Sequence, residues 1–177
     1  MKLGLTFLRV VVGALFFGHG TQKLFGWFGG HGIEATSGAF ESLGLRPGRK
    51  HATAAGAAEA GGGALVALGF LTPAAAASLI GVMYTAIQKV HLKNGPWATE
   101  GGYEYNLALI AVMVVLADLG PGDFSIDHAL GLEVNGPLVA LLAAGAGIAG
   151  AVVMTGGAQP PEPAPAPAET PEPAATV

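Results

Sequence analysis

Residues 52–71 read ATAAGAAEAGGGALVALGFL, a stretch of helical length in which one acidic residue, Glu59, lies among alanine, glycine and a few larger apolar side chains. A segment with so many small residues would insert poorly into a bilayer by itself, so its stability must come from neighbouring helices. Small residues four positions apart let helix backbones approach closely inside lipid. Three such pairs are present: Gly56/Ala60, Ala57/Gly61 and Ala58/Gly62. The stretch therefore predicts a helix inside a bundle.

Four more apolar segments accompany it, and each approaches the ~17–25 residues that a tilted helix needs to cross a bilayer. They run from Leu3 to Gly20, Thr72 to Val90, Tyr105 to Leu119 and Leu138 to Met154. The chain of 177 residues is 51% hydrophobic and 11% charged, which leaves too little polar surface to cover five such helices in water. We therefore expect an all-α polytopic membrane protein, with the lipid bilayer as its first partner.

The distribution of charge predicts an orientation. Basic residues gather in the connection from Lys23 to His51 and around Lys89 and Lys93, whereas the opposite side is acidic. The positive-inside rule then places the N-terminus outside. The first segment superficially resembles a secretory signal peptide, but Arg9 interrupts it and no cleavage pattern follows, so we interpret it as a retained span.

Three regions follow from these boundaries: a four-helix membrane domain over 1–131, an additional transmembrane helix in 132–157, and a disordered Pro/Ala/Glu-rich tail over 158–177. The tail reads as a spacer, with a Pro-rich ligand for a partner as the alternative. Within the long loop 24–51, residues Ile33 to Leu43 predict a short interfacial helix; the alternative is an irregular loop that dips into the bundle. The chain lacks cysteine, which excludes thiol chemistry and Cys-ligated metal sites.

The polar residues inside the apolar segments fall at similar depths. Because the helices alternate in direction and rise ~1.5 Å per residue, most of these groups should form one layer near the basic-loop face. The layer consists of His19, Gln22, Glu59, Tyr84, Gln88, His91 and the group from Glu104 to Asn106. Arg9 lies deeper, and either pairs with Glu59 or extends toward the outer face.

Glu59 is the strongest candidate within this layer, because an ionisable group in hydrocarbon usually has a partner or a task. It either accepts a proton or a hydrogen bond in a pocket, or it joins two helices by a polar contact with His19, Tyr84, Gln88 or Arg9. His19 is the second catalytic candidate. His19 and His91 could ligate a haem, although surface or capping roles are commoner for such positions. We expect His31 and His51 to be solvated loop residues, and no metal site is predicted.

Five stretches in order resemble the DoxX family of bacterial membrane proteins. They are RVVVGALFFGHGTQKLFGWFGGHGIEATSGAFESLGL (9–45), EAGGGALVALGFLTP (59–73), VHLKNG (90–95), GGYEYN (101–106) and GPGDFSIDHALG (120–131). The resemblance covers roughly residues 5–131. It implies a four-helix membrane bundle, in some members associated with quinone-linked oxidation of reduced sulfur compounds or with terminal oxidase complexes. The recurrent polar positions of the family fall on Arg9, His19, Gly20, Gln22, Lys23, Glu59, Gly62, His91, Glu104 and Asp127.

Asp127 follows Ser125 at an expected helix start, so we interpret it as an N-terminal cap rather than a catalytic group. The helix after Gly131 lies outside the resemblance, and its small pairs Ala143/Gly147 and Ala146/Gly150 predict that it packs against its own bundle or a partner.

Two functional classes remain open. The first is a subunit of a quinone-linked oxidoreductase complex, with Glu59 and His19 handling protons and Tyr84 and Gln88 bonding a quinone carbonyl. The second is a non-enzymatic scaffold or small-solute transporter. Nucleotide-binding, hydrolase and nucleic-acid-binding patterns are absent from the sequence. Catalytic activity, oxidoreductase partner subunits and a homo-oligomer all stay open.

Overall fold

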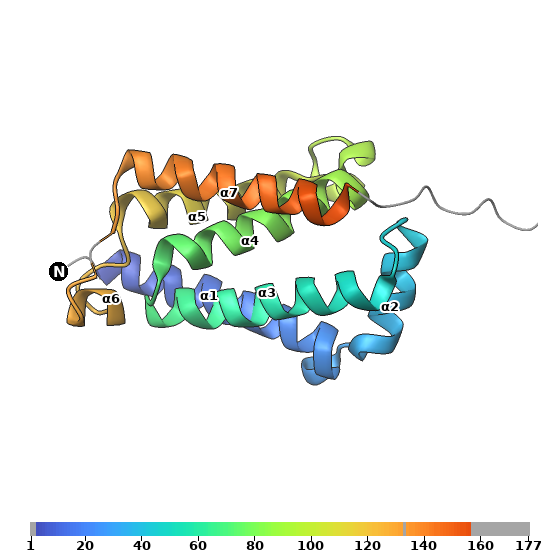
Figure 1. Cartoon of the computed structure of the whole chain (residues 1–177), viewed down its shortest axis with the longest axis horizontal. Coiled ribbons are helices and arrows are strands. Elements are labelled where there is room, and N and C mark those ends of the chain that lie inside the picture. Colours follow the sequence, from blue (N-terminus) through green and yellow to red (C-terminus); the bar gives the residue numbers. More distant parts are fainter. Residues whose placement is uncertain (1–2, 133, 157–177) are drawn as a thin grey trace, which may run out of the picture.

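The computed structural model describes residues 3–132 and 134–156, and within these ranges the fold is all-α, as the sequence predicted. The tail expected over 158–177 lies outside the described residues. The α-helices are α1 (Leu3–Phe25), α2 (Gly32–Ser42), α3 (Gly48–Leu68), α4 (Thr72–Ala86), α5 (Glu104–Leu119), α6 (Ile126–Ala129) and α7 (Pro137–Thr155). Short 3-10 turns occupy Trp27–Gly29, Leu92–Asn94 and Ala98–Glu100, and a π-helical turn occupies Ile87–His91 (Figure 1).

Each of the five apolar segments is a helix, although the boundaries differ from those expected. The first helix extends to Phe25 and the second begins at Gly48, so both continue into the polar loop between them. Among the described residues, α1 and α7 are long and apolar enough to cross a membrane by length and composition. Helices α4 and α5 have 15 and 16 residues, and the π turn continues α4 to His91.

Glycines allow α1 and α3 to pack with their backbones in contact. A Cβ atom at Gly20 would lie 2.2 Å from the backbone nitrogen of Ala60, and one at Gly13 would lie 2.5 Å from that of Ala67. No side chain fits at such distances. The small pair Gly56/Ala60 therefore belongs to a real helix crossing, as its spacing indicated.

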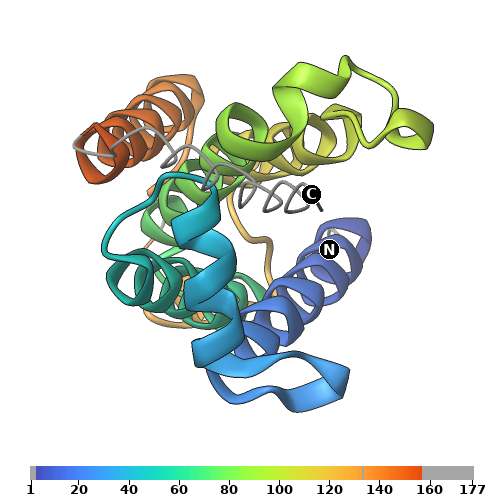
Figure 2. The same cartoon turned by 90° about the vertical axis from the view of Figure 1, so that its right-hand side faces the viewer.

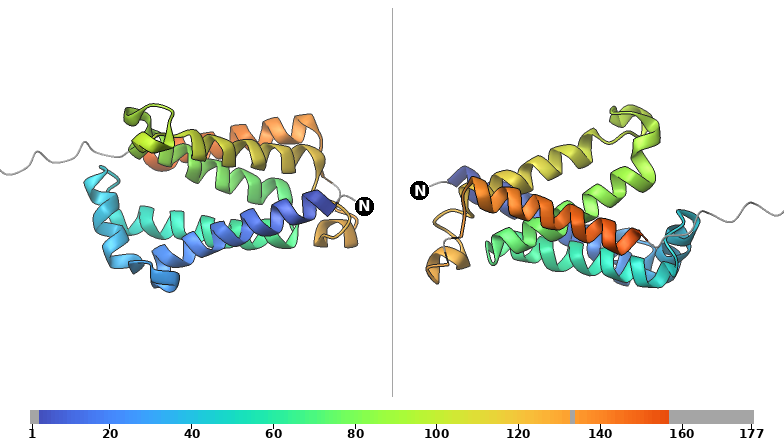
Figure 3. Two further views of the ribbon diagram at one scale, coloured as in Figure 1. Left: turned by 180° about the vertical axis from the view of Figure 1, so that it is seen from behind. Right: turned by 45° about the horizontal axis from the view of Figure 1, so that its top comes forward.

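Helix α4 packs against α3 near the turn that joins them and also contacts α5 and α7. It diverges from α3 along its length, so the two helices form a V that opens toward α2 (Figures 1 and 3). Helix α7 lies against α4, where Gly147 approaches the backbone of Ala77 and Gly81. The C-terminal helix thus packs against its own bundle, through the Ala143/Gly147 pair that the sequence singled out.

The apolar core fills the narrow part of this V. Its fully buried side chains come from α3, α4 and α5: Val66, Leu79, Ile80, Met113 and Leu116. At the other end, the expected helix of the long loop is present as α2, which runs across the ends of α1 and α3 (Figure 2).

Polar side chains close the core end of the bundle. Arg9 is buried and donates to the carbonyl of Ala67 near the end of α3, so it extends toward the turn between α3 and α4 rather than pairing with Glu59. Asp127 accepts hydrogen bonds from the backbone N–H of Leu71 (2.8 Å) and Thr72 (3.0 Å) and from the Thr72 hydroxyl (2.7 Å). Asp127 is therefore a cap, but of α4 rather than of its own helix, where Ser125 has that role.

Candidate functional site

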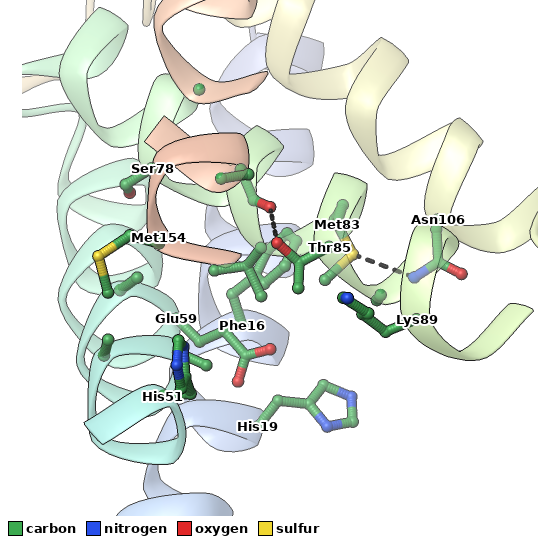
Figure 4. Close-up of a pocket in the computed structure, with 18 of the residues that line it drawn as sticks. Phe16, His19, His51, Glu59, Ser78, Met83, Thr85, Lys89, Asn106 and Met154 are labelled. Carbon is green, nitrogen blue, oxygen red and sulfur yellow. Dashed lines mark hydrogen bonds between the residues drawn. The ribbon is translucent and has the colours of Figure 1, made fainter. Parts of the chain in front are cut away.

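A cavity of about 580 Å³ occupies the open part of the V, between α1 and α3 on one side and α4, α5 and α7 on the other (Figure 4). Its walls are mostly apolar, with contributions such as Phe16, Leu45, Val82 and Leu109. Phe40 and Leu43 from the α2 region lie at its edge. The volume falls within the range of ~300–1,000 Å³ that is typical of small-molecule sites.

An ion pair between Lys23 and Glu59 forms the polar centre of this cavity. Lys23 Nζ lies 2.5 Å from Glu59 Oε2, and the Glu59 side chain is only 4% exposed. The close crossing of α1 and α3 at Gly20 and Ala60 positions both groups, because Lys23 follows Gly20 by one turn and Glu59 precedes Ala60. Sequence reasoning included Lys23 among the ligand-binding candidates but did not foresee this pairing.

The second carboxylate oxygen of Glu59 has no such partner. Within residues 3–132 and 134–156, Oε1 accepts no hydrogen bond, although the side chain is almost fully buried. The Oε1 atom itself remains accessible, because the fully buried side-chain polar atoms without a partner among the described residues are Thr6 Oγ1 and Arg9 Nε. Figure 4 shows this carboxylate facing the cavity, so a bound molecule with a hydrogen-bond donor would find an acceptor there.

Two histidines line the cavity beside Glu59. His19, one turn before Lys23 on α1, is close enough to interact electrostatically with the Glu59 carboxylate. His51 is 7% exposed and lies in the first turn of α3, two helical turns before Glu59. The expectation that His51 is a solvated loop residue was wrong, because the helix starts at Gly48 and turns this ring inward. The eight-residue spacing between His51 and Glu59 was the available signal.

The opposite wall is formed by α4, its π turn and α5. The π turn places Lys89 and His91 at the cavity, and such turns are frequent at functional sites. The ring nitrogen Nδ1 of His91 lies 2.8 Å from the carbonyl oxygen of Gly101. Asn106, which is buried, donates to Met83 Sδ at 3.4 Å, and sequence reasoning had placed it in the layer only as a neighbour of Glu104.

Five predicted site residues do not line the cavity. Gln22 donates to the carbonyl of Phe28, and Glu104 accepts from the backbone N–H of Ala98 at 2.8 Å. Tyr84 is half-buried and Gln88 is exposed, because α4 turns both away from the cavity. Arg9 lies at the other end of the bundle. The cavity therefore brings together His19, Lys23, Glu59 and His91 of the predicted set.

The donor set does not form a metal centre among the described residues, where no group of three or more His, Cys, Asp or Glu side chains could hold a metal ion. What the arrangement offers is an apolar slot with two basic side chains, three histidines and one carboxylate at one end. Such a site can hold a flat or elongated apolar molecule and exchange hydrogen bonds or protons with a polar head group.

Comparison with known proteins gives one family. A family model described as DoxX matches residues 4–92, which include α1 to α4 and the π turn. The match ends before the GGYEYN and GPGDFSIDHALG motifs and before α7. Searches of curated proteins and of solved structures gave no match.

Proposed function

Because the chain belongs to the DoxX family and carries two helices able to cross a bilayer, we propose that this membrane protein binds a quinone in the cavity and serves as a subunit of a quinone-linked oxidoreductase complex. The observation that carries the proposal is the pair of half-buried Lys23 and buried Glu59 in the wall of a mostly apolar cavity. A membrane quinone combines a flat apolar ring with two polar oxygens, and this cavity offers the complementary chemistry.

The residues around the ion pair suit both redox forms of the ring. Lys23 and His19 can donate hydrogen bonds to a quinone carbonyl, whereas Glu59 Oε1 can accept one from a quinol hydroxyl. Reduction of the ring to a quinol takes up two electrons and two protons, and the imidazoles of His19 and His51 line the same cavity. Tyr84 and Gln88, which face away, have no part in this site.

The proposed topology is multi-pass in the bacterial inner membrane. Helices α1, α3, α4 and α5 form the four-helix bundle, α7 adds a fifth span, and α2 lies in the interface. The N-terminus is outside by the positive-inside rule. Since the chain contains no cysteine, it supplies no thiol to carry electrons, so they come from a bound cofactor or, in the complex proposed here, from an oxidoreductase partner subunit.

The first prediction concerns Glu59→Gln, which keeps the shape of the side chain but removes its charge. Lys23 then loses its counter-ion and the ring loses the Oε1 acceptor. We expect the affinity for a soluble decyl-benzoquinone to fall about tenfold, a loss of ~1.4 kcal/mol. The measurement is equilibrium binding to the purified full chain in lipid nanodiscs, together with extraction and mass spectrometry of the quinone that copurifies.

Glu34→Gln is the matched control, because Glu34 also pairs with a basic residue, Arg49, but on the surface with both side chains well exposed. This variant should bind as the native chain does. If the native chain binds no quinone, or if both glutamine variants lose affinity equally, the quinone site is wrong. A scaffold or a solute transporter is then the better description, although the closure of the far end of the bundle by Arg9 and Asp127 disfavours a path through it.

A further inference from the structure

We propose that α7 forms the tail-binding wall of the cavity, so that a bilayer amphiphile with its head group at the Lys23–Glu59 pair runs its hydrocarbon tail out between α3 and α7. This inference rests on the proposed function, which identifies the amphiphile as a quinone. It goes further by assigning a role to a helix that lies outside the family match and by naming the part of the ligand that this helix contacts.

The cavity is chemically divided. Its basic, acidic and histidine side chains all belong to α1, α3 and the π turn, whereas α7 contributes small or apolar groups and a threonine. A ring and its head-group oxygens would not fill about 580 Å³. The remaining space adjoins α7, where only hydrocarbon matches the walls.

Small side chains keep this space open on both sides. Besides His51 and Glu59, the lining residues of α3 are Ala54, Ala55 and Ala58, and those of α7 include Ala146, Gly150 and Met154. A Cβ atom at Gly150 would meet nothing within 4 Å. By contrast, α7 carries large side chains where it points away from the cavity, such as Leu141 and Val152, which are 71% and 50% exposed.

The cavity face of α7 differs from the face that packs against α4. Where α7 packs, at Gly147, the backbone of α4 is in contact and a side chain would clash. At Gly150, less than one turn later, space remains. A second observation concerns the head-group end: Glu59, whose side chain is 4% exposed, turns toward the same cavity its Oε1 atom, which accepts no hydrogen bond within the described residues.

The experiment uses photolabelling of the full chain in lipid nanodiscs. One probe is a benzoquinone with a decyl tail that ends in a diazirine; the other carries the same tail on a phosphocholine head. Labelled residues are identified by mass spectrometry, and labelling of Ala146 and Ala151 is measured relative to Val152, which points away from the cavity. In the native chain the quinone probe should favour the cavity face.

Gly150→Leu places a side chain in the proposed tail space, where a Cβ atom meets nothing within 4 Å, and should lower cavity-face labelling by the quinone probe about tenfold. Gly145→Leu is the matched control, because position 145 is also open but does not line the cavity. It should leave the labelling unchanged. Circular dichroism of both variants checks that α7 remains helical.

The outcomes separate the two proposals. Labelling of α7 that is absent, or equal in the two leucine variants, overturns the tail wall even if Glu59→Gln still weakens quinone binding. If the phosphocholine probe labels the cavity face as strongly and Gly150→Leu abolishes that labelling, the tail wall stands while the quinone head group fails. If Gly150→Leu loses quinone labelling and Gly145→Leu does not, both the tail wall and the quinone site are supported.

Discussion

Gly20→Leu should dismantle the bundle and with it the cavity. The Cβ atom of any residue at this position would lie 2.2 Å from Ala60 N and 2.6 Å from the Gly56 carbonyl oxygen. Overpacking among flexible side chains typically costs ~1–3 kcal/mol, but here the obstacle is helical backbone that cannot move aside locally. We expect a loss of more than about 3 kcal/mol in the free energy of unfolding. Thermal unfolding in mild detergent, followed by circular dichroism and by size-exclusion chromatography, measures the effect.

The control is Gly18→Leu on the same helix, where a Cβ atom meets nothing within 4 Å. Both substitutions replace glycine by leucine and raise helix propensity equally, so only the contact with α3 differs. The control should unfold at or above the native temperature. A second consequence concerns function, because separating α1 from α3 also separates Lys23 from Glu59. If the Gly20 variant were as stable as the Gly18 variant, the close crossing of α1 and α3 would be wrong.

The sequence predicted the helical elements well because the physical causes of those elements are local. Apolar runs of suitable length and the glycines and prolines between them determine where helices form, and small residues four apart indicated the crossings at Gly56/Ala60 and Ala143/Gly147. The helix ends were less predictable. Helices α1 and α3 continue into the polar loop, where Lys23 and His51 line the cavity. The positions of these helix ends depend on contacts between segments that are distant in the sequence.

The candidate site was predicted in part for the same reason. Depth along a helix follows from residue number, so the sequence placed His19, Glu59 and His91 near one level. The direction in which a side chain points around its helix depends on how the neighbouring helices pack. Residue spacing alone therefore does not predict which side chains face the cavity. The divergence of α4 from α3 turns Tyr84 and Gln88 away from the cavity, while the π turn brings Lys89 to it.

Asp127→Ala should be the second severely destabilising change. The carboxylate accepts three hydrogen bonds at the start of α4, from the backbone of Leu71 and Thr72 and from the Thr72 hydroxyl. Loss of a helix cap costs ~0.5–2 kcal/mol, and a buried donor left without an acceptor costs ~1–3 kcal/mol more. Asp127 also attracts the buried Arg9 electrostatically. We therefore expect a loss of about 3–4 kcal/mol, measured by thermal or denaturant unfolding in detergent.

A graded series tests the mechanism. Asp127→Asn keeps one acceptor oxygen and should lose about half as much stability as the alanine variant. Asp118→Ala is the control, because Asp118 is an acidic residue near the same end of the bundle whose side chain makes no hydrogen bond within the described residues. It should change the unfolding temperature little. Equal losses of stability in Asp118→Ala and Asp127→Ala would mean that negative charge in general, rather than the cap of α4, stabilises this end. Asp127→Asn would then lose as much stability as Asp127→Ala. Because α4 carries the π turn and one wall of the cavity, a frayed start of α4 should also weaken quinone binding, which the control would leave intact.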